Sequence, residues 1–171
     1  MPIALNMTVP LRQDPEAQQQ LQELGATFAQ TVQPMIDAAL SRSQIVHYAR
    51  ILVIDNKYLQ VLTEFDGDPM QYTEFFRQQL GPVFQKVFSL VEGAPSWEEL
   101  DNPNSFFEFS SGYNLKSLGE STGGNEGRGY LFSAFGDTTV REIKAALGRQ
   151  GNGEAPEPPS QAQQPEATAG S

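Results

Sequence analysis

The sequence contains no cysteine and only one histidine, His47, in 171 residues. The absence of cysteine excludes disulfides, a thiolate nucleophile and cysteine-based zinc sites. One histidine cannot complete a nitrogen-based metal site, so we expect no metal. No apolar run approaches the ~20 residues that span a bilayer. The first residues also lack the basic start and apolar run of a secretory signal, so we expect a cytoplasmic protein.

Basic residues are scarce: 11 Lys and Arg stand against 21 Asp and Glu, which gives a net charge of -10. Such a chain repels phosphate backbones and anionic lipids, so neither a nucleic acid nor a membrane is an expected partner. Large apolar residues are absent from 149–171, where Pro, Gln, Ala and Glu dominate. This composition predicts a folded domain over residues 3–147 and a disordered tail over 148–171.

The first half of the chain carries clear local signals. Apolar residues alternate over 3–9 and predict a strand. Asp14-Pro15 is a helix start, and Pro34 predicts a break in that helix near Val32. Residues 45–54 and 58–65 are rich in β-branched and aromatic residues and predict a hairpin.

In the second half, Asp68-Pro69 begins another predicted helix, which Gly81-Pro82 interrupts. Residues 105–110 and 130–135 are predicted strands, separated by a Gly-rich loop over 111–128. Asp137 or Thr138 is expected to cap a last helix. The order is β-α-β-β-α-β with an extra strand and a C-terminal helix. It predicts an α+β fold, a ferredoxin-like sandwich whose four-stranded antiparallel sheet carries its main helices on one face.

The hairpin indicates which face of the sheet is dry. If Ile54 pairs near Tyr58, residues of equal parity share a face. Odd positions are then nearly all apolar and predict the core. Even positions mix apolar and polar groups, which favours a face covered by a second copy, and therefore a homodimer. The even positions are Tyr48, Arg50, Leu52, Ile54, Tyr58, Gln60, Leu62 and Glu64.

Several segments resemble a known superfamily: Val46-His47-Tyr48-Ala49-Arg50, Phe65-Asp66-Gly67-Asp68, Leu80-Gly81-Pro82 and Val91-Glu92-Gly93-Ala94-Pro95. They are similar to small bacterial proteins of the dimeric α+β-barrel superfamily, in particular to ferredoxin-like domains encoded beside or fused to haem peroxidases and catalases. The resemblance implies the fold, the dimer and an oxidoreductase partner.

The same superfamily includes cofactor-free monooxygenases, haem-degrading enzymes and dye-decolorising peroxidases, with sites on the open sheet face. The resemblance therefore makes haem a candidate cofactor, although no cofactor is evident in the sequence itself. Two departures count against peroxidase activity. Thr63 stands where those peroxidases have the first Gly of Gly-x-x-Asp-Gly, and no histidine follows in the region of their haem ligand.

Arg50 has the best polar surroundings in the sequence, with Tyr48, Tyr58 and Glu64 beside it on the even face. It could bind an anionic or oxygen-rich ligand, or it could pair with Glu64 across the hairpin inside a dimer interface. We favour the structural pair. His47 falls on the core side by parity, where a hydrogen-bonded role is favoured over a ligand or base.

Two further clusters have simple structural interpretations. Glu64, Asp66 and Asp68 could hold a cation, but a turn followed by a helix cap is favoured. No catalytic residue can be assigned. We predict a small dimerising accessory or ligand-binding protein. The alternative is an oxidoreductase, either a cofactor-free monooxygenase or a haem- or peroxidase-linked enzyme, with its site on the open sheet face.

Overall fold

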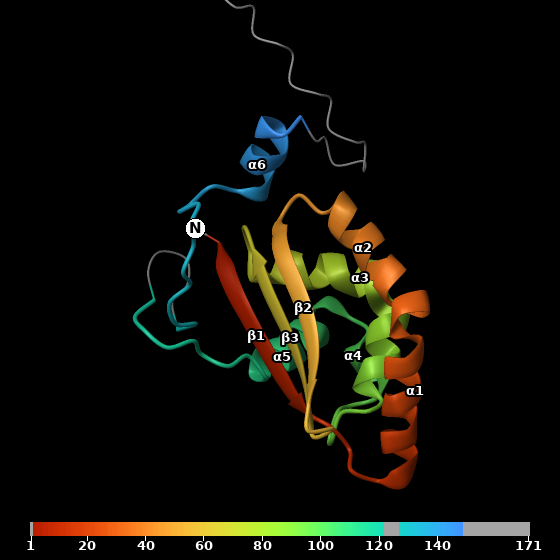
Figure 1. Cartoon of the computed structure of the whole chain (residues 1–171). Helices are drawn as coiled ribbons and strands as arrows, with labels where there is room; N and C mark the ends of the chain where they lie inside the picture. The colour runs from red at the N-terminus through yellow and green to blue at the C-terminus, as the bar shows by residue number, and fades with distance from the viewer. Residues whose placement is uncertain (1, 122–126, 149–171) are drawn as a thin grey trace, which may run out of the picture.

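The computed structural model describes residues 2–121 and 127–148, and it shows an α+β fold. One antiparallel sheet has the strand order β1-β3-β2, so the hairpin strand β3 lies in the centre (Figure 1). Within these ranges, no helix has both the length and the apolar composition needed to cross a membrane. The strands are β1 (Ile3–Pro10), β2 (Val46–Ile54) and β3 (Tyr58–Phe65).

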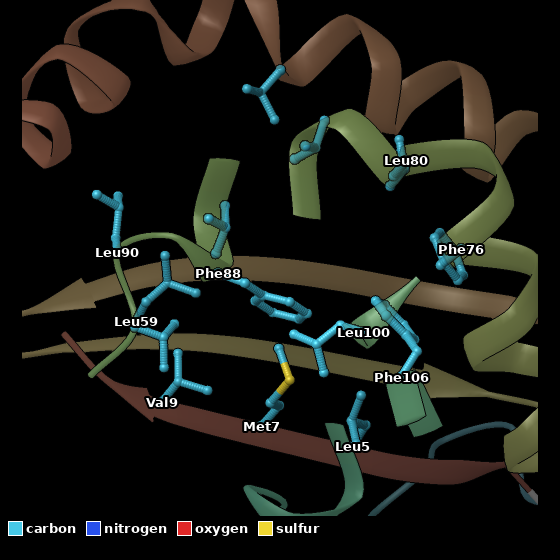
Figure 2. Packing of buried hydrophobic residues seen from close by; sticks show 14 of the residues in the cluster. Leu5, Met7, Val9, Leu59, Phe76, Leu80, Phe88, Leu90, Leu100 and Phe106 are labelled. Atoms are coloured by element: carbon cyan, nitrogen blue, oxygen red, sulfur yellow. The ribbon is translucent and has the colours of Figure 1, made fainter. Parts of the chain in front are cut away.

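Helices pack against one face of this sheet and bury odd-numbered side chains of β1 and β3. Figure 2 shows Leu5 and Met7 of β1 close to Leu100 and Phe106, which come from two different helices. The described helices are α1 (Pro15–Thr31), α2 (Gln33–Arg42), α3 (Pro69–Phe88), α4 (Trp97–Leu100), α5 (Pro103–Gly112) and α6 (Val140–Ala146).

The predicted starts and breaks of the long helices are confirmed. The Asp14 carboxylate accepts a hydrogen bond from Ala17 N, and Asp68 accepts one from Gln71 N, as N-caps do. The first predicted helix is divided at Val32 into α1 and α2. Helix α3 is kinked, and Leu80 there leaves the helical region at φ -125° and ψ 20°.

The hairpin register is also as expected, because Ile54 pairs with Tyr58. Asp55 and Asn56 in the turn have φ of 51° and 54°, the left-handed values that a type I′ turn requires. The odd face is the helix-covered one: Leu59 is 2% exposed. The edge strand β2 departs from this pattern, because Ile51 and Val53 at odd positions are 37% and 46% exposed.

The strand predicted over 105–110 is wrong, because these residues belong to α5. Its aromatic residues resemble a strand in composition, yet a helix start precedes them. The Asn102 side chain accepts a hydrogen bond from Ser105 N at 2.9 Å, and Pro103 occupies the first helical position. Phe106 and Ser110, four residues apart, are both buried on the inner side of the helix.

The closing strand predicted over 130–135 is also wrong, so the described sheet has three strands rather than four. A different segment runs beside the outer edge of β1. Thr8 N donates to Tyr113 O at 2.9 Å, and Leu115 N donates to Asn6 O at 3.0 Å. These contacts surround an isolated antiparallel bridge between Met7 and Asn114, which is too short to count as a fourth strand.

At the C-terminal end, the cap of α6 is Thr139, not Asp137 or Thr138. Its hydroxyl accepts from Glu142 N while the Glu142 carboxylate accepts from Thr139 N, which forms a capping box. Of the predicted tail over 148–171, all but Gly148 lies outside the described residues.

Candidate functional site

A β-bulge at the start of β2 decides where His47 lies. Val46 pairs with Phe65 and is buried in the core, whereas Tyr48 pairs with Glu64, so His47 is an extra residue. An extra residue shifts the alternation of side chains by one. The placement of His47 on the core side by simple parity is therefore wrong: His47 lines a cavity together with Tyr48 and Glu64.

This cavity, which we call the polar cavity, has a volume of about 340 Å³. It brings together four of the five predicted site residues: His47, Tyr48, Arg50 and Glu64. Tyr58 does not line it, because Tyr58 pairs with Ile54 beside the hairpin turn, at the other end of the strands.

The sequence pattern does not predict the opposite wall of the polar cavity. This wall consists of Pro2 and the segment 131–135, which belongs to a predicted strand. Hydrogen bonds hold the chain just before that segment in place. Ser117 N donates to Arg128 O at 2.9 Å, and the Arg128 guanidinium donates to Ala4 O at 3.4 Å. Arg128 thus connects this wall to β1.

His47 is held in a fixed orientation by Asp66. The distance from His47 Nε2 to Asp66 Oδ1 is 2.9 Å, and both side chains are nearly buried, with 10% and 13% exposed. Asp66 Oδ2 also accepts a hydrogen bond from Val140 N at 2.7 Å, which anchors the first turn of α6 to the end of the sheet. No cation is needed to explain Asp66, because both of its oxygens have partners.

Arg50 forms no ion pair with Glu64 within the described ranges, although both side chains line the polar cavity. The structural pair favoured from sequence is therefore not seen. Arg50 is exposed, so its five guanidinium donors remain open to an incoming group. Tyr48, His47 and Glu64 add hydroxyl, imidazole and carboxylate groups around the same space.

In the described part of the chain, no three or more His, Cys, Asp or Glu residues come together in a way that could hold a metal ion. Comparisons with protein-family models, with curated proteins and with solved structures found no match. What the site does must therefore be argued from its own geometry.

Proposed function

We propose that this protein binds a small organic anion, a carboxylic acid with an apolar body, in the polar cavity. The observation that carries the proposal is the unpaired guanidinium of Arg50 at a cavity of about 340 Å³. This volume lies in the usual range for small-molecule sites, about 300–1,000 Å³.

The two walls suit the two ends of such a ligand. Arg50 can hold a carboxylate through two parallel N–H···O bonds, the geometry for which guanidinium is best suited. Leu131, Phe132 and Phe135 on the opposite wall offer apolar surface to the body of the molecule. Glu64 accepts hydrogen bonds and repels a second negative charge, which favours a monoanion with a hydroxyl or amino substituent.

Titration with 4-hydroxybenzoate, followed by amide shifts in NMR spectra or by calorimetry, tests this proposal. A hydrogen bond to a charged group contributes about 1.5–3 kcal/mol, so Arg50→Ala should weaken binding about 10- to 100-fold. Lys57→Ala is the matched control, because it removes a cation at the hairpin turn and should leave the affinity unchanged. Equal affinity of Arg50→Ala and the native chain would refute the proposal.

We also propose that the even face of the sheet joins two copies of the chain. Leu52, Ile54 and Tyr58 lie on this face and are 42%, 41% and 46% exposed. Burial of such a contiguous apolar patch is what favours association. Light scattering after size exclusion should show a dimer that Leu52→Glu converts to a monomer. Leu118→Glu, at a residue that is 93% exposed and off the sheet, should stay dimeric. The dimer proposal is contradicted if the native chain is a monomer at micromolar concentration.

The ferredoxin-like arrangement is part of the same proposal. Its support is the order β1-β3-β2, together with the chain at 113–115 that runs antiparallel beside β1. The accessory role beside an oxidoreductase, the oxidoreductase alternative and haem as a cofactor stay predictions. Haem is tested by adding haemin to the purified protein: a shifted Soret band supports it, and an unchanged haemin spectrum removes it.

A further inference from the structure

A second cavity, of about 280 Å³, lies on the other face of the sheet, beneath the helices. We call it the inner cavity. It lies where both covering helices are interrupted: Gln33, just after the break between α1 and α2, lines it, and so does Leu80 at the kink of α3. Because both helices change direction there, side chains do not fill the space between them and the sheet.

The lining of the inner cavity is almost entirely aliphatic and aromatic, with contributions from all three strands and from α1, α2 and α3. Its polar residues fall into two groups. Gln33, Asp37 and Arg50 are exposed at the rim. Thr63 and Tyr72 are buried, with only 3% and 6% of their surface exposed. An apolar lining of this kind favours an apolar guest.

The buried hydroxyls of Thr63 and Tyr72 leave one donor unused. Thr63 Oγ1 and Tyr72 Oη are 2.8 Å apart, and either atom can be the donor. Two hydroxyl groups carry two O–H donors, yet one bond uses only one of them. Each hydroxyl oxygen has one partner in this pair, and no buried side-chain N or O atom of the described residues is without a hydrogen bond. The second O–H can in addition donate to a guest that carries an acceptor atom.

Tyr72 is rigidly placed for this role. Its ring stacks on Phe65 with the ring centres 4.0 Å apart and the planes at 18°, and the ring centre of Phe76 lies 5.0 Å from that of Tyr72. Burial raises the pKa of the Tyr72 phenol far above its usual value, and the charge of Glu64 raises it further. The phenol therefore stays protonated and remains a neutral donor.

We propose that the inner cavity binds a small, neutral, apolar molecule with one hydrogen-bond acceptor oxygen, such as a ketone or an aldehyde. The apolar body occupies the space under the helix breaks, and its oxygen accepts the spare O–H of the Thr63–Tyr72 pair. The inner cavity and the polar cavity share Ala49 and Arg50 of the edge strand β2 in their linings, but the rest of the inner cavity lies beneath the helices and takes an uncharged ligand.

Acetophenone and α-methylstyrene test the proposal, because they have nearly the same shape and differ in a carbonyl oxygen against a methylene group. The decisive variant is Thr63→Val with Tyr72→Phe. Replacing both partners of a buried hydrogen bond by apolar groups of the same shape is close to neutral for stability, so this chain should fold. The ratio of acetophenone to α-methylstyrene affinity, measured by NMR titration, should fall about tenfold in the double variant.

Two neighbouring residues on opposite faces of β3 provide the control for location. Val61→Phe fills the inner cavity and should abolish binding of both probes, whereas Leu62→Phe, on the other face, should leave both unchanged. The proposal is overturned if the native chain binds neither probe at millimolar concentration, if the double variant keeps the native affinity ratio, or if Val61→Phe still binds them. None of these outcomes depends on 4-hydroxybenzoate, so the two sites are tested separately.

Discussion

Asp66→Ala should loosen the C-terminal helix α6 from the sheet. The Asp66 carboxylate accepts hydrogen bonds from Val140 N at 2.7 Å and from the ring of His47 at 2.9 Å. Helix α6 has only seven residues, too few to be stable alone, so its order depends on such contacts. Val140 of this helix is also buried, and Lys144 donates hydrogen bonds to the carbonyls of Ser41 and Ser43.

The size of the effect follows from the bonds that are lost. Hydrogen bonds to a charged group contribute about 1.5–3 kcal/mol each, and the two share one carboxylate, so we expect a loss of about 2–3 kcal/mol rather than their sum. Part of this loss stays local, because α6 can detach while the sheet remains folded. The urea midpoint should therefore fall, and amide exchange at Ile143 and Leu147 should speed up more than exchange in β3.

A matched control is Asp37→Ala, which removes an exposed carboxylate that forms no hydrogen bond or ion pair within the described residues. Its urea midpoint should stay within about 0.5 kcal/mol of the native value. Asp66→Asn keeps one acceptor oxygen, so its urea midpoint should lie between those of Asp66→Ala and Asp37→Ala. The reasoning is refuted if Asp66→Ala unfolds at the native midpoint while the amides of α6 keep their native protection.

Two further changes have defined outcomes. Hydrogen bonding from Arg77 holds the pKa of Glu74 below its usual 4.5, so this pair stabilises the fold above pH 4.5, and its contribution is lost as the pH falls through the lowered value. In urea titrations at pH 7 and pH 3, the free energy of unfolding of Glu74→Gln should therefore fall less on acidification than that of the native chain. An equal fall in the two chains contradicts this prediction. Gly129→Ala would drive Cβ into the backbone oxygen of Ser117 at a φ of +86°, so the nearby cavity wall must shift and 4-hydroxybenzoate should bind several-fold more weakly. Gly136→Ala, also at positive φ but with open space around it, should keep the affinity.

Helix starts and breaks could be predicted because they depend on neighbours in sequence. Asp14-Pro15 and Asp68-Pro69 place an acceptor and a fixed φ at the first turn, whatever the rest of the chain does. The strand predicted over 105–110 is wrong because the helix start before it outweighs its aromatic composition. Asn102-Pro103 has the same cap chemistry as the other two starts, and it precedes the aromatic residues of α5.

Part of the candidate site could also be predicted from the sequence pattern. Parity along the hairpin put Tyr48, Arg50 and Glu64 on one face, and the register confirms it. The bulge at His47 was not predictable, since it depends on how the start of β2 meets the end of β3 and leaves no local signal. The wall at 131–135 is held by contacts distant in sequence, which periodicity cannot show.

Thr63 is a further signal that the sequence itself carries. It is the polar residue on an otherwise apolar odd face of β3, and a hydroxyl on the dry side of a sheet has to find a partner. Its partner is Tyr72, which lies in the first turn of α3, on the side of the helix that faces the sheet. A polar exception inside a predicted core is thus more informative than the apolar pattern around it. Here it leads to a buried donor at the wall of the inner cavity.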